Sequence, residues 1–79
     1  MCRINCEIED GLIPAEKVAR LTTADGRPEE VVVSTKHVSG NTLCASEIGR
    51  EGDRVLVELP RESTSGRWRV WVHQKQLGG

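Results

Sequence analysis

Apolar and polar side chains alternate with a period of two along several short stretches of this chain, the pattern of a half-buried β-strand. In residues 2–9, two cysteines and two isoleucines alternate with arginine, asparagine and glutamates. Residues 54–60 repeat the pattern, with two valines and a leucine on one face, and Pro60 ends the stretch. Both stretches therefore predict strands with one face turned to a core.

Residues 15–22 admit two interpretations. Pro14 suits the first turn of a short helix, and two apolar side chains would then share one helix face. A strand is favoured because the "ADGR" turn at residues 24–27 leads into the β-branched run of residues 29–35, which needs a neighbouring strand. Pro28 suits the entry of that later strand, where a missing N–H does least harm.

The remaining segments complete an all-β pattern. "TLCAS" at residues 42–46 predicts a short strand, "GREGD" at residues 49–53 a loop, and residues 67–74 a final strand after a hairpin. Short strands at this spacing indicate a sandwich or barrel, and two stacked sheets would be thin at this length. We expect one domain over residues 1–79, a small, partly open barrel of five or six antiparallel strands.

The run "IGREGDRVLVELP", followed by a hairpin into "SGRWRVWV", resembles the entry and return strands of SH3-like small barrels. The resemblance covers about residues 48–77. It implies an architecture that hosts peptide-binding, nucleic-acid-binding and assembly roles, and so no single activity. The proline-peptide-binding class has a tyrosine-lined groove, and this chain has no Tyr. The sequence is also similar to small bacterial proteins from which no function carries over.

Charge is unevenly distributed. The chain has a formal net charge of −1, which excludes a strongly basic nucleic-acid-binding protein. Residues 1–60 contain seven Lys and Arg against eleven Asp and Glu, giving −4, whereas residues 61–79 contain four against one, giving +3. The final strand is therefore a local basic feature on an acidic body.

Both tryptophans of the chain lie in this basic strand. Alternation places Trp68 on the same face as Val70 and Val72, so we expect Trp68 in the core. The opposite face is predicted to present Arg67, Arg69, Trp71 and His73. Guanidinium and imidazole groups around an indole suit an anionic peptide or a stacked base. This set is the candidate binding site.

Three roles remain open for Trp71: covering an open barrel end, forming a protein or homodimer interface, and stacking on single-stranded nucleic acid. The acidic body disfavours nucleic acid, because phosphate contacts dominate its affinity. A protein partner or a second copy is the expected partner. The predicted function is therefore that of a noncatalytic binding or assembly module.

Catalytic, metal-binding and membrane functions find little support in the sequence. No nucleophile elbow or His-x-x-Glu motif is present. On a strand, Cys2 and Cys6 would lie about 13 Å apart along the axis, too far to share a zinc ion. Cys6 and Cys44 are expected to be buried as small apolar side chains. We expect no catalytic residue, no metal, no cofactor and no membrane segment, in a cytoplasmic protein with reduced thiols.

The terminal Gly78 and Gly79 suggest a different class. The chain resembles ubiquitin-like modifiers and small sulfur carriers in ending with Gly-Gly, which in those proteins threads into an activating enzyme. Those proteins have a helix after the first hairpin, whereas residues 27–35 are strand-like here. The simpler interpretation is a frayed chain end.

Overall fold

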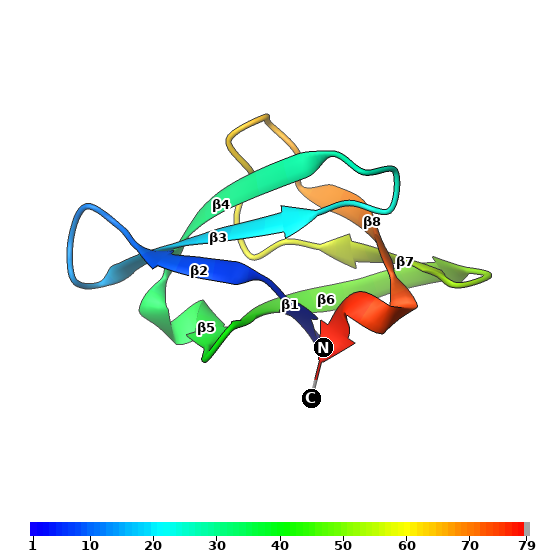
Figure 1. Ribbon diagram of the computed structural model, residues 1–79, viewed down its shortest axis with the longest axis horizontal. Coiled ribbons are helices and arrows are strands. Elements are labelled where there is room, and N and C mark those ends of the chain that lie inside the picture. Colours follow the sequence, from blue (N-terminus) through cyan, green and yellow to red (C-terminus); the bar gives the residue numbers. More distant parts are fainter. Residues whose placement is uncertain (79) are drawn as a thin grey trace.

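Two antiparallel β-sheets enclose an aliphatic core in the computed structural model, which describes residues 1–78 (Figure 1). The first sheet has the order β8-β7-β6-β1-β9, with β5 also on β6; the second has the order β2-β3-β4. The strands are β1 (Cys2–Asn5), β2 (Glu7–Asp10), β3 (Glu16–Thr22), β4 (Pro28–Ser34), β5 (Val38–Ser39), β6 (Thr42–Glu51), β7 (Arg54–Glu58), β8 (Arg69–His73) and β9 (Leu77–Gly78). The all-β prediction is confirmed, and the sheets do not form a closed barrel.

Within residues 1–78, the helical content is limited to two short turns. Two 3-10 turns, η1 (Thr35–His37) and η2 (Gln74–Gln76), precede β5 and β9. In the part of the chain that the structure describes, no helix has the length and hydrophobicity to cross a membrane.

The first predicted strand belongs to both sheets. β1 pairs with β6 and β9 in the first sheet, whereas β2 pairs with β3 in the second. The two strands are separated only by Cys6, whose backbone N–H donates to the carbonyl of Asn41 at 2.8 Å. The chain therefore bends from one sheet into the other at this residue.

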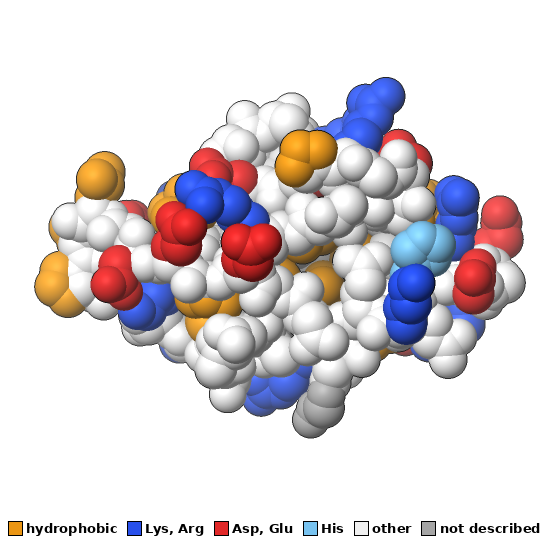
Figure 2. Space-filling view, in the orientation of Figure 1, with side chains coloured by type: hydrophobic (Ala, Val, Ile, Leu, Met, Phe, Trp, Pro, Cys, Tyr) orange, Lys and Arg blue, Asp and Glu red, His pale blue; other side chains and the backbone are white. Residues whose placement is uncertain are grey.

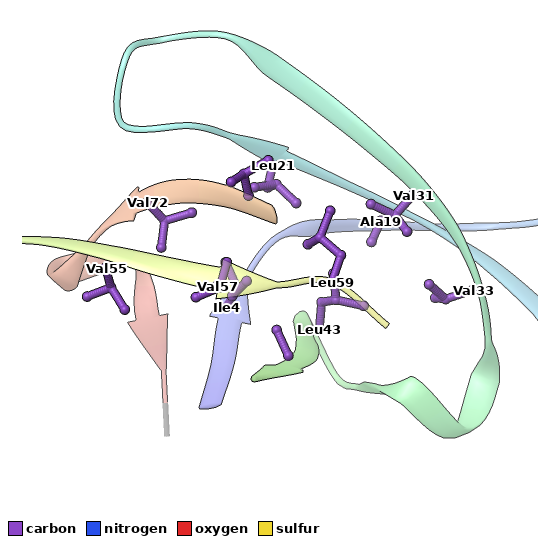
Figure 3. Packing of buried hydrophobic residues seen from close by; sticks show 12 residues of the cluster. Ile4, Ala19, Leu21, Val31, Val33, Leu43, Val55, Val57, Leu59 and Val72 are labelled. Carbon is purple, nitrogen blue, oxygen red and sulfur yellow. The ribbon is translucent and has the colours of Figure 1, made fainter. Parts of the chain in front are cut away.

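Alternation along the strands supplies the core. Most inward positions are aliphatic, with the buried Glu29 on β4 as an exception. Within residues 1–78, twelve hydrophobic residues are buried: Ile4, Ala19, Leu21, Val31, Val33, Leu43, Ala45, Val55, Val57, Leu59, Val70 and Val72. Figure 3 shows these side chains directed into the space between the two sheets. Neither tryptophan belongs to the cluster.

The predicted strand boundaries hold in part. The segment whose interpretation was open is a strand, β3 from Glu16 to Thr22, and not a helix, and Pro28 begins β4 as expected. β6 is longer than predicted, because it runs to Glu51 and includes most of the expected loop at residues 49–53. A register shift between Glu47 and Gly49 interrupts the pairing with β7. Such a bulge breaks the period of two, so the sequence pattern ends before the strand does.

Two five-residue loops are built alike, "TADGR" at residues 23–27 and "STSGR" at residues 63–67. In each loop the N–H of the first residue donates to the carbonyl of the Arg at 2.8 Å. The N–H of the Gly donates to the carbonyl of the first residue at 2.9 Å. The hydroxyl of the first residue accepts the Arg N–H at 3.1 Å in both. Gly26 and Gly66 have φ of 83° and 87°, which a side chain would strain.

These loops connect the open edges of the two sheets. The N–H of Ala24 donates to the carbonyl of Trp71 on β8 at 2.8 Å. The N–H of Thr64 donates to the carbonyl of Glu30 on β4, also at 2.8 Å. Each loop thus binds the edge strand of the opposite sheet. We call this region, residues 23–27 and 63–67 with the edges of β4 and β8, the seam.

Candidate binding groove beside Trp71

The outer face of β8 is set by the buried valines that flank Trp71. Val70 and Val72 point into the core, so the residues between and beside them face outward. Across the β7–β8 ladder the facing pairs are Arg69–Glu58, Trp71–Leu56 and His73–Arg54. Trp71 is 37% exposed.

A narrow apolar row crosses this face. Leu56, on β7, pairs with Trp71 on β8 and with Gly49 on β6. A Cβ added at Gly49 would meet no atom within 4 Å, so the row ends in open space. The indole and the leucine therefore form an accessible apolar strip with charged residues on both sides.

A groove of about 170 Å³ forms where the loop of residues 23–27 meets this face. It is lined by Thr23, Asp25, Arg54, Leu56, Arg67, Arg69, Val70 and Trp71. We call it the Trp71 groove. Its apolar surface comes from the indole and Leu56, and three guanidinium groups stand against one carboxylate around it.

The three arginines differ in how they are paired. Arg69 lies 3.1 Å from the carboxylate of Glu58, and Arg67 lies 3.6 Å from that of Glu29. Arg54 has no carboxylate partner among residues 1–78. Arg54 is therefore the cation in the groove with the least competition for an incoming anion.

The single carboxylate of the groove is engaged within its own loop. Asp25 accepts a hydrogen bond from the hydroxyl of Thr23 and lies 3.5 Å from the guanidinium of Arg27. The Thr23 hydrogen bond, with smaller contributions from Arg27 and Arg67, lowers the pKa of Asp25 below its usual value. Asp25 is thus an ionised structural group of the loop.

The four predicted site residues lie in two separate depressions. Arg67, Arg69 and Trp71 meet in the Trp71 groove, but His73 lines a separate depression of about 470 Å³ with Asp53, Gln74 and Lys75. The predicted set omitted Arg54 and Leu56, although the alternation in residues 54–60 puts both on the outward face. It also omitted the loop of residues 23–27, which only the seam brings to β8.

The prediction that Trp68 is a core residue is wrong. Trp68 is 52% exposed. β8 begins at Arg69, and Trp68 lies at the rim of an open depression of about 310 Å³ that Met1, His37 and Pro60 also line. Alternation determines which way a side chain points, but burial also requires a second layer above it, and the second sheet does not cover this position.

The cysteines are half-buried. Cys2 and Cys6 pack against the core, whereas Cys44 lines surface depressions, so full burial of Cys6 and Cys44 is not observed. Burial raises the pKa of the Cys6 thiol to about 11. Within residues 1–78, no three His, Cys, Asp or Glu side chains gather as a metal site.

The end of the chain is held in place as far as it is described. Gly78 pairs with Arg3 in the β1–β9 ladder, and Leu77 packs against the core. A Cβ added at Gly78 would lie 2.5 Å from the side-chain oxygen of Asn5. Gly78 is therefore not a frayed end, and Gly79 lies outside the described residues.

Comparison with known proteins gives no relative: no family model matches the chain, and neither a curated protein nor a solved structure matches it.

Proposed function

We propose that this protein is a noncatalytic binding module whose Trp71 groove takes an acidic segment of a protein partner. One observation carries the proposal: a partly exposed indole and a leucine lie in one groove with three guanidinium groups. A segment that offers one apolar side chain between carboxylates matches this arrangement.

Each part of the groove supplies a distinct contribution. Trp71 and Leu56 remove an apolar side chain from water, and the flat indole does so with little loss of conformational entropy. Guanidinium groups donate paired hydrogen bonds to carboxylates, which orients the segment. Tryptophan and arginine are also the residues that most often dominate binding energy at protein interfaces.

The groove is preorganised by backbone pairing. Trp71 and Leu56 lie on adjacent strands in fixed register, and the loop above them is tied to β8 through the carbonyl of Trp71. Binding therefore orders few groups that are mobile in the free protein, which lowers its entropic cost.

Single-stranded nucleic acid fits the groove less well. Binding along a phosphate backbone needs several free cations in a row. Here Arg67 and Arg69 have carboxylate partners, and the chain as a whole is acidic. A groove of about 170 Å³ accommodates one side chain better than a track of stacked bases.

The test uses Trp71 as its own reporter. In the Trp68→Phe variant Trp71 is the only indole, so its fluorescence reports on the groove. We expect a saturable change on titration with a synthetic peptide of alternating Glu and Leu, weakened by added salt. A peptide with Lys in place of Glu should give no saturable change.

Calorimetry with matched variants locates the binding. Trp71→Ala should abolish binding of the Glu-Leu peptide, whereas Trp68→Ala, which removes the same ring outside the groove, should retain it. Equal affinity in both variants overturns the proposal. Saturable binding of a poly(dT) oligonucleotide with none of the peptide would instead assign the groove to nucleic acid.

A further inference from the structure

A second surface of unusual composition lies at the opposite end of the long hairpin that borders the groove. The loop between β2 and β3, residues 11–15, exposes Leu12 to 99% and Ile13 to 55%. Figure 2 shows hydrophobic side chains projecting at this end of the molecule. We call residues 11–15 the Leu12 tip.

The Leu12 tip is ordered by backbone contacts. Gly11 donates to the carbonyl of Glu16 at 3.1 Å, and Glu16 donates to that of Ile13 at 3.0 Å. The N–H of Thr35 donates to the carbonyl of Ala15 at 3.0 Å, which ties the loop to the end of β4. The tip therefore holds its apolar side chains in water on a fixed backbone and loses little freedom when they are covered.

Charges around the tip restrict what can cover it. Asp10 and Glu16 flank it directly, and Lys17 pairs with Asp10 at 2.5 Å. Glu9, which precedes Asp10 on β2, pairs with Arg20 at 2.6 Å, so these three carboxylates exceed the two cations by one. Figure 2 shows acidic side chains beside basic ones behind this end. The acidic excess favours an apolar pocket with a basic rim and disfavours an anionic membrane surface.

We propose that the Leu12 tip of one copy docks into the Trp71 groove of a second copy of this chain. This inference rests on the proposed function, because it names the acidic, apolar segment that the groove takes. Leu12, the more exposed of the two apolar side chains, would lie on Trp71 and Leu56, and the flanking carboxylates would face the arginines.

Topology requires two chains for this contact. The tip precedes β3 and the groove-forming loop of residues 23–27 follows it, so the length of a seven-residue strand, about 23 Å, separates them. A tip cannot reach its own groove across that distance. The contact joins two different surfaces, so each copy keeps one free tip and one free groove, and association can continue head to tail.

The expected association is weak and depends on concentration. One loop in one small groove buries less surface than a standard protein–protein interface. In sedimentation velocity we expect the weight-average sedimentation coefficient of the wild type to rise steadily with concentration at low salt. The rise should diminish at high salt, since the groove and the tip carry opposite charge.

Two variants and their mixture provide the decisive measurement. Leu12→Asp removes the tip without touching the groove, and Trp71→Ala removes the groove without touching the tip. Each variant alone should sediment as a monomer at every concentration. Their mixture should form a heterodimer that stops at two chains, because one intact tip and one intact groove remain. Trp68→Ala, the control, should associate like the wild type.

The outcomes separate this inference from the proposed function. A wild type that stays monomeric, variants that associate like the wild type, or a mixture that stays monomeric overturns self-docking. If the groove still binds the Glu-Leu peptide in that case, the proposed function stands and the partner is another protein. If wild type, but not Leu12→Asp, sediments with phosphatidylcholine vesicles and stays monomeric without them, the tip binds lipid and self-docking is wrong.

Discussion

Trp68 and Trp71 are three positions apart and serve different purposes. Trp71 lies inside β8, where its alternation with two buried valines fixes it on the outer face beside Leu56. Trp68 lies one residue before the strand and is the more exposed of the two. A core of Val, Leu, Ile and Ala leaves both rings at the surface, and only Trp71 lies in a groove with cations.

Cys6 provides a pH-dependent test at the residue scale. Burial raises the pKa of its thiol from 9.0 to about 11 in the folded protein. In the unfolded chain the thiol loses its proton first, so a rise in pH through this range favours unfolding. We expect the Cys6 contribution to the free energy of unfolding to be constant below pH 9 and to decline toward pH 11.

Urea denaturation at a series of pH values checks this expectation. Lysines and other groups titrate in the same range, so the comparison is with Cys6→Ala, which lacks the thiol. The wild type should lose more stability than Cys6→Ala between pH 9 and about 11. Parallel curves for the two proteins would mean that the Cys6 thiol ionises equally easily in both states.

At the scale of elements, the seam explains how an open pair of sheets holds together. Each of its two loops uses the same internal hydrogen bonds and binds the edge strand of the opposite sheet. Between the loops lies Glu29, whose side chain is only 4% exposed. Its carboxylate accepts a hydrogen bond from Ser65 at 2.7 Å and lies 3.6 Å from Arg67. Arg67 therefore serves the seam as well as the groove.

The two groove arginines should differ in their effect on stability. Arg67→Met leaves the buried carboxylate of Glu29 without its cation and should cost about 2 kcal/mol. Arg69→Met breaks an exposed pair with Glu58 and should cost at most about 1 kcal/mol. Urea denaturation of both variants measures the difference.

A second substitution identifies the cause of the Arg67 effect. Glu29→Gln removes the buried charge, so adding it to Arg67→Met should recover part of the lost stability. A larger cost for Arg69→Met than for Arg67→Met, or no recovery in the double variant, would contradict a structural role for the Glu29–Arg67 pair.

The strands also show which features of the fold the hydrophobic pattern predicts. Local alternation predicted the inward faces of β1, β7 and β8, where Ile4, Val55, Val57, Val70 and Val72 are buried. It failed in β6, where the bulge after Glu47 changes the period within one strand. It brought Arg67, Arg69 and Trp71 together but assigned His73 to the same site, since alternation reports the face of a sheet and not the separate depressions on it.

At the scale of the whole molecule, two sheets share a core of small and medium aliphatic side chains. Ile4 is fully buried on β1, which pairs with β6 on one side and β9 on the other. β1 continues into β2 of the second sheet, so Ile4 lies close to the point where the sheets join. Interactions at this point contribute to the stability of both sheets.

Ile4→Ala should lower the free energy of unfolding more than Trp68→Ala, although isoleucine is the smaller side chain. Ile4→Ala creates a cavity in the core and should cost about 2–5 kcal/mol, a large share of the total of about 4–12 kcal/mol for a domain of this length. Trp68→Ala removes a half-exposed ring and should cost less than about 1 kcal/mol. Thermal and urea unfolding measure both, and a larger cost for Trp68→Ala would place the ring in the core.

The sequence by itself determined the all-β architecture, the inward faces of β1, β7 and β8, and the basic outward face of β8, because these depend on a period of two between near neighbours. Tertiary structure alone decided that Trp68 is exposed, that the loop of residues 23–27 lies over β8, and that Arg54 and Leu56 meet Trp71. Burial and grooves depend on which distant segments cover a face, and alternation along one strand does not carry that information.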